Sequence, residues 1–89
     1  MNPPTTPTDI TDITRTVADI AAGEIGGGVQ LAADTDLRAV QGVDSVKMLR
    51  MIAKIERAFD VELEDEDVFG ISTVGGAAAL VEQALRERV

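Results

Sequence analysis

The sequence predicts an all-α fold: a small four-helix bundle, made of three main helices and one short helix, with a long loop between the first two. Aromatic residues make up only 2% of the 89 residues, so the core must be built from aliphatic side chains. Such a mixture suits packed helices better than a sheet. Three segments also repeat apolar residues at the period of an amphipathic helix. Each of these segments follows a residue that can cap a helix.

The first helix is expected to begin at Ile10. Thr8 or Asp9 can cap its start, and Asp12 lies in the first turn, where the helix dipole favours a carboxylate. Apolar residues step by three and four along one stripe, at Ile10, Ile13, Val17 and Ile20. All three prolines lie within residues 1–8. These residues are expected to form a flexible tail ahead of a single domain at 9–89.

No sustained period is present between Val29 and Val43, after the run Gly26-Gly27-Gly28. This segment is interpreted as a long ordered loop whose few apolar residues enter the core. Loops of this length are uncommon in small domains and are often functional. The apolar residues in question are Leu31, Leu37 and Val40.

The second helix is predicted from Ser45 to Phe59, with Asp44 as its N-cap. At about 100° per residue its side chains separate into three faces. The core face holds Met48, Met51, Ile52, Ile55 and Phe59. The opposite face is basic and holds Lys47, Arg50, Lys54 and Arg57. Val46, Leu49 and Ala53 lie on a flank between the two.

The rest of the chain predicts a short helix and a last long one. The short helix covers about Asp65 to Phe69 and is ended by Gly70. Ser72 or Thr73 then caps the last helix. Its apolar stripe consists of Val74, Ala77, Ala78, Val81, Ala84 and Leu85.

Composition narrows the classes of function. Sixteen acidic against eight basic residues give a net charge of −8, which disfavours binding to nucleic acid or to an anionic membrane. The chain has neither cysteine nor histidine, so a thiolate metal site, a disulfide and the commonest acid–base catalyst are all excluded. The acidic run at 62–67 lacks the spacing of a calcium loop. We expect a cytoplasmic, monomeric protein that is not an enzyme and has no metal site.

Ser45 is the most informative residue. Its position predicts a primary hydroxyl at a helix N-terminus, where free backbone N–H groups and the helix dipole favour a phosphate. Asp44 caps the helix, and its carboxylate could orient a metal-bound phosphate donor. Gly42 allows a sharp turn just before.

The segment Gly42-Val43-Asp44-Ser45-Val46 resembles the Gly-x-Asp-Ser-Leu attachment motif of acyl and peptidyl carrier proteins. The similarity continues through Ile55 to Leu63 and through Asp67 to Val74, and it covers roughly Ile10 to Leu85. It implies that a transferase moves 4′-phosphopantetheine from coenzyme A onto Ser45. The terminal thiol of this arm would then hold an acyl or aminoacyl group as a thioester. The implied partners are a phosphopantetheinyl transferase, a loading enzyme, and a condensing enzyme, acyltransferase or thioesterase.

The chain departs from that family in its second helix. Fatty-acid carriers present acidic residues there, whereas four basic residues against Asp44 and Glu56 give this helix a charge of about +2. We therefore expect a freestanding acyl carrier of a specialised polyketide or nonribosomal-peptide type pathway. A discrete peptidyl carrier, loaded by an adenylation enzyme, is the alternative. A non-carrier acidic helical interaction module is a more distant one.

Seven residues near Ser45 are candidates for partner docking. The apolar flank of Val46, Leu49 and Ala53 is interpreted as a docking patch, with partial burial as the alternative. The basic residues are interpreted as either a second docking element or an ordinary solvated face; they are Lys47, Arg50, Lys54 and Arg57.

Overall fold

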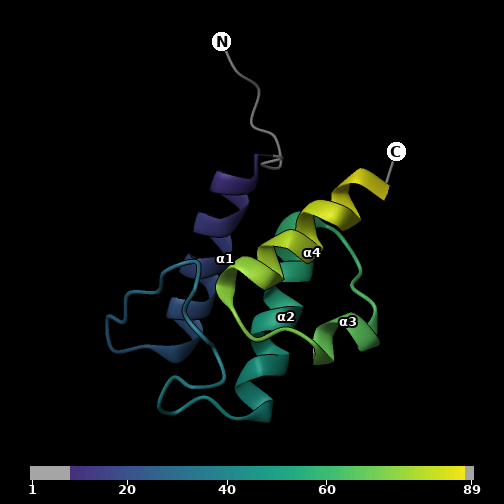
Figure 1. The fold of residues 1–89 in the computed structure, drawn as a ribbon. Coiled ribbons are helices and arrows are strands. Elements are labelled where there is room, and N and C mark those ends of the chain that lie inside the picture. The colour runs from purple at the N-terminus through teal and green to yellow at the C-terminus, as the bar shows by residue number, and fades with distance from the viewer. Residues whose placement is uncertain (1–8, 88–89) are drawn as a thin grey trace.

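The computed structural model describes residues 9–87, in which it forms four helices. They are α1 (Ile10–Ile25), α2 (Ser45–Phe59), α3 (Asp65–Phe69) and α4 (Val74–Glu87). α1 and α2 run in opposite directions, and α4 packs against both (Figure 1). In the same view, α3 lies on the other side of α2 from α1. The all-α four-helix bundle is confirmed. The predicted tail at 1–8 and the last two residues lie outside the described residues.

Side-chain caps explain where the three main helices begin. The Asp9 carboxylate accepts a hydrogen bond from the Thr11 backbone N–H at 2.8 Å, so Asp9 is the cap of α1. The Asp44 carboxylate accepts a hydrogen bond from the Lys47 backbone N–H at 2.9 Å, so Asp44 is the cap of α2. At α4, the Thr73 hydroxyl accepts from the Gly76 N–H at 2.9 Å. Each bond satisfies an N–H that has no partner within its own helix.

The core is aliphatic apart from Phe59, and no polar side chain of residues 9–87 is buried in it. On α2, the predicted core face is buried except for Met48, which is half-buried. Removing such side chains from water is the main source of stability in a domain this small. The buried residues are Ile13, Val17, Ala21, Leu37, Met51, Ile52, Ile55, Phe59, Val61, Ile71, Val74, Ala77, Ala78 and Val81.

The long loop between α1 and α2 is ordered because its middle is fastened to the start of α4. Leu37 is 1% exposed, and its N–H donates to the Ser72 carbonyl at 2.6 Å. In the other direction, the N–H groups of Val74 and Gly75 donate to carbonyls in the loop, at 3.2 Å and 2.7 Å. Asp36 and Thr73 pair as an isolated antiparallel bridge. The expected ordered loop is confirmed, with Leu37 as its buried anchor and Leu31 and Val40 half-buried.

Within residues 9–87, no helix combines the length and the apolar character that crossing a bilayer requires.

Candidate functional site

Ser45 is the first residue of α2 and is exposed. Asp44 before it is extended, with its carboxylate on the Lys47 N–H and its carbonyl accepting from the Met48 N–H at 3.0 Å. The remaining N–H groups of the first turn have no acceptor within the helix. The Ser45 hydroxyl therefore lies at the solvent-exposed N-terminus of α2, where the partial positive charge of the helix dipole favours a phosphate ester.

Gly42 shapes the approach to this serine. Its φ is +89°, a conformation that L side chains rarely adopt, and a Cβ built at this position would meet no heavy atom within 4 Å. The limit at Gly42 is therefore backbone strain rather than lack of space. Gly42 is the third residue of a turn that is closed by a hydrogen bond from the Val43 N–H to the Val40 carbonyl at 3.2 Å. The expected sharp turn before Asp44 is present.

An open pocket of about 370 Å³ lies beside Ser45, between the start of α2 and α3. Most of its lining side chains are apolar, and the two charged ones are Arg38 and Asp44. Such a site can shelter an apolar chain while the polar end stays in solvent. The lining residues are Arg38, Val43, Asp44, Ser45, Met48, Leu49, Val68 and Phe69.

One side chain links the far wall of this pocket to the long loop. α3 has no buried residue. Arg38 reaches across from the long loop and donates from Nε to the Ile71 carbonyl at 2.8 Å and from Nη2 to the Phe69 carbonyl at 2.6 Å. Charge-assisted bonds of this kind are stronger than neutral ones. Arg38 thus fixes the C-terminal end of α3 relative to the loop that leads to Ser45.

The predicted apolar flank of α2 faces solvent. Val46 is 56% exposed and Leu49 is 61% exposed, and Ala53 is exposed as well. The alternative of partial burial is therefore wrong for these residues. A further apolar side chain joins them from α3, where Phe69 is 75% exposed.

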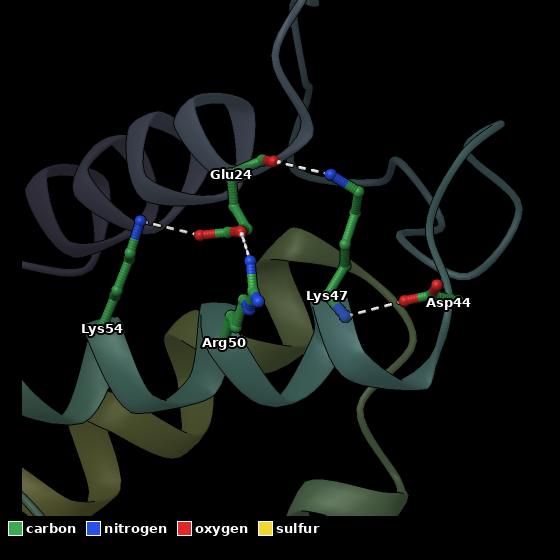
Figure 2. A network of polar contacts seen from close by, with 5 residues as sticks. All are labelled: Glu24, Asp44, Lys47, Arg50 and Lys54. Atoms are coloured by element: carbon green, nitrogen blue, oxygen red, sulfur yellow. Dashed lines mark hydrogen bonds and ion pairs between the residues drawn. The ribbon is translucent and has the colours of Figure 1, made fainter.

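The basic face of α2 meets a carboxylate from α1 (Figure 2). Glu24, whose side chain is only 9% exposed, binds Lys54 Nζ at 2.7 Å and Arg50 Nη1 at 3.7 Å. Lys47 Nζ donates to the Glu24 backbone carbonyl at 3.1 Å. Arg57 is exposed and lies outside this network. Three of the four predicted basic residues thus tie α2 to the C-terminal end of α1.

The hydrogen bond from Lys54 lowers the pKa of the Glu24 carboxyl below its ordinary value. Partial desolvation opposes this shift, and the charges of Lys54, Arg50 and Lys47 add to it. Glu24 is therefore ionised at neutral pH and offsets part of the charge of the basic face.

Within residues 9–87, no three acidic side chains gather in a way that could hold a metal ion.

Residues 8–81 match the family described as a phosphopantetheine attachment site. The chain belongs to this family of carriers. The carrier is also 31% identical over 70 residues to an acyl carrier protein of Exiguobacterium sp., covering 78% of this chain and 89% of the relative. An acyl carrier protein of Prochlorococcus marinus is 34% identical over 53 residues, covering 60% of this chain and 66% of the relative.

The cofactor of this carrier family is a covalently attached 4′-phosphopantetheine arm. The site fits such a group, because an exposed hydroxyl, an open backbone turn and an apolar pocket lie together at one helix end. When bound, the arm supplies a terminal thiol to which a cargo is attached as a thioester.

Three residues of the carrier's site escape prediction from sequence. Glu24 is separated from its cationic partners by the whole loop, and Arg38 acts through carbonyl groups that belong to no pattern. Phe69 is exposed, although an isolated aromatic residue in a short helix would be expected in the core.

Proposed function

We propose that Ser45 is the residue to which the arm is attached, within a carrier domain formed by residues 9–89. The observation that carries this proposal is the exposed Ser45 hydroxyl at the capped start of α2, beside an open apolar pocket. Asp44 holds the backbone of this turn in place. The Ser45 oxygen would attack the phosphorus of coenzyme A that bears the pantetheine half. The bond from that phosphorus to the 3′,5′-ADP half would break, and the hydroxyl proton would pass to the transferase.

The arm would present acyl intermediates to the enzymes of a specialised polyketide or nonribosomal-peptide type pathway. Support comes from α2, whose basic face differs from the acidic helix expected of a fatty-acid carrier. The same basic face keeps a peptidyl carrier, loaded with an aminoacyl group by an adenylation enzyme, as the second candidate. The family match removes the support for a non-carrier interaction module.

The proposed partners are a transferase, a loading enzyme and a condensing enzyme, acyltransferase or thioesterase. They would approach over Val46, Leu49 and Ala53, whose exposure supports a docking role. Lys47, Arg50, Lys54 and Arg57 would border that approach. A cytoplasmic location, a monomeric state and the lack of catalytic activity remain predictions.

Intact-mass analysis tests the attachment site. The protein is incubated with coenzyme A, Mg²⁺ and a broad-specificity phosphopantetheinyl transferase. We expect the wild type to gain the mass of one phosphopantetheine group and Ser45→Ala to gain none. Ser72→Ala is the matched control, because Ser72 is an exposed serine just before another helix, and it should be modified like the wild type. Modification of Ser45→Ala, or none of the wild type, would refute the proposal.

A further inference from the structure

The first turn of α2, which presents Ser45, is the part of this helix that the hydrophobic core holds least. The first residue of α2 with a buried side chain is Met51. Among residues 45–50, Lys47 and Met48 are half-buried and the others are exposed. Met48 also borders the open pocket, so one side of it is not packed. Segments with few buried apolar contacts lie at the low end of local stability, and this turn is one of them.

The segment that leads into this turn is held by local hydrogen bonds. The Ala39 N–H donates to the Asp36 carbonyl at 3.1 Å, and the Val43 N–H donates to the Val40 carbonyl at 3.2 Å. Both bonds close short turns and reach no helix. A polar contact that joins the first turn of α2 to another helix therefore has a large influence on where the turn lies.

Lys47 makes such a contact (Figure 2). Its backbone N–H donates to the capping carboxylate of Asp44 at 2.9 Å, and its Nζ donates to the Glu24 carbonyl at 3.1 Å. Glu24 lies in the last turn of α1, where the carbonyls have no partner within the helix. That turn has no basic residue of its own, so the Lys47 ammonium also supplies the positive charge that a helix C-terminus favours.

The Glu24 carboxylate holds the end of α1 against later turns of α2. It binds Lys54 at 2.7 Å and Arg50 at 3.7 Å. Three cations of α2 thus meet one residue of α1, and the contact of Lys47 is the one nearest to Ser45. The carboxylate fixes the acceptor in place, and Lys47 transmits that position to the turn that presents the serine.

We propose that Lys47 is a positioning residue for attachment of the arm. By binding the Glu24 carbonyl, it keeps the first turn of α2 folded and holds the Ser45 hydroxyl where it can attack the phosphorus of coenzyme A. A nucleophile that leaves its reacting geometry loses rate even when its own chemistry is unchanged. This inference rests on the proposed function, because it concerns transfer of the arm to Ser45.

Amide hydrogen exchange of the unmodified protein, followed by NMR, tests the effect on the turn without any enzyme. Lys47→Met keeps the aliphatic stem but cannot donate to Glu24. The N–H groups of residues 47–49 should exchange about threefold faster or more, as expected for the loss of one hydrogen bond from a charged donor. Exchange at Ile55, in the core, should stay unchanged. Arg57→Met removes a charge from the same face outside the network and is the matched control, without effect on residues 47–49.

The rate of arm attachment tests the effect on the serine. For each variant, kcat/KM for phosphopantetheinyl transfer is measured by intact mass at low salt and at about 0.5 M salt, where attraction between separated charges is screened. Lys47→Met should lower kcat/KM about threefold at both salt concentrations, because the lost contact lies inside the carrier. Lys47→Gln, whose side chain is too short to reach Glu24, should do the same, and Lys47→Arg should recover most of the rate. Arg15→Met, at an exposed position of α1, should behave like the wild type.

Three results would overturn the inference. In the first, residues 47–49 exchange no faster in Lys47→Met than in Arg57→Met. In the second, the loss of kcat/KM disappears at high salt, which would make Lys47 a contact for the transferase. In the third, Lys47→Arg is as slow as Lys47→Met. Hydrogen exchange needs no arm, so a wild type that takes up no phosphopantetheine would refute the proposed function by a separate result.

Discussion

The two flanks of α2 are built in different ways. On the flank that faces α1, buried aliphatic side chains and the Glu24 network hold the helix to its neighbour. On the flank that faces α3, there is an open pocket, and α3 itself buries none of its residues. One flank positions the start of α2, and the other leaves room beside it. A carrier needs both, because its serine must stay in place while cargoes are attached to the arm and removed from it.

The chain's two phenylalanines provide the largest expected difference between these flanks. Phe59 is 1% exposed in the core, so Phe59→Ala should cost about 3–5 kcal/mol of unfolding free energy through lost burial and the cavity left behind. Phe69→Ala should change it by no more than about 0.5 kcal/mol. Urea unfolding followed by circular dichroism gives both values. If Phe59→Ala is too unstable to purify, Phe59→Leu replaces it. Equal losses of unfolding free energy at Phe59 and Phe69 would contradict the distinction between a packed flank and an open flank of α2.

A smaller effect is expected where Arg38 holds α3. Arg38→Ala removes two hydrogen bonds to the carbonyls of Phe69 and Ile71, one part-buried and one exposed, and should cost about 1–2 kcal/mol. Hydrogen exchange should accelerate in residues 68–74 and stay unchanged in α1. Arg38→Lys should behave almost like Ala, because lysine lacks the planar fork that serves both carbonyls. Protection that falls equally in α1 would show that Arg38 supports the whole fold instead.

The smallest expected effect is the pH dependence of the α1 flank. The pKa of Glu24 is lowered in the folded protein, so its ionised form stabilises the fold above the ordinary value of 4.5. This contribution is lost as the pH falls through the lowered pKa of the folded state. Glu24→Gln should therefore lower the urea midpoint at pH 7 and should converge with the wild type in acid. Glu62→Gln, at an exposed position outside the network, is the control. A difference in urea midpoint between Glu24→Gln and the wild type that persists at low pH would contradict stabilisation by the ionised Glu24 carboxylate.

Prediction from sequence succeeds where local rules decide. The bounds of α2 follow from its apolar period and the Asp44 cap, and α3 ends just before Gly70 as expected. The choice between Ser72 and Thr73 stays open in the sequence, because both side chains can cap a helix. Only the position of the Gly76 N–H, 2.9 Å from the Thr73 hydroxyl, decides it.

The candidate site is predicted less completely than the fold. The position of Ser45 and its cap follow from α2 alone, whereas the sequence leaves open whether Val46 and Leu49 are exposed, and the structure decides it. The pairing of the basic face with Glu24 depends on α1 and α2 running in opposite directions, which no local pattern encodes. The pocket lies between the start of α2 and α3, and Arg38 reaches from the loop to the end of α3 beside it. Contacts between distant segments are the part that local sequence rules leave undetermined.

The anchoring of the long loop at Leu37 also divides it into two parts with different tolerance to change. Residues 26–28 are exposed glycines with positive φ, so a side chain placed on one of them would strain the backbone, but no other atom lies within 4 Å of an added Cβ and there is space for inserted residues. The hydrogen bonds of residues 33–38 to the start of α4 and to the end of α3 separate this stretch from Ser45. A spectroscopic label or a short peptide tag could therefore be inserted among the glycines, and the carrier could be followed at work without disturbing the turn that presents its serine.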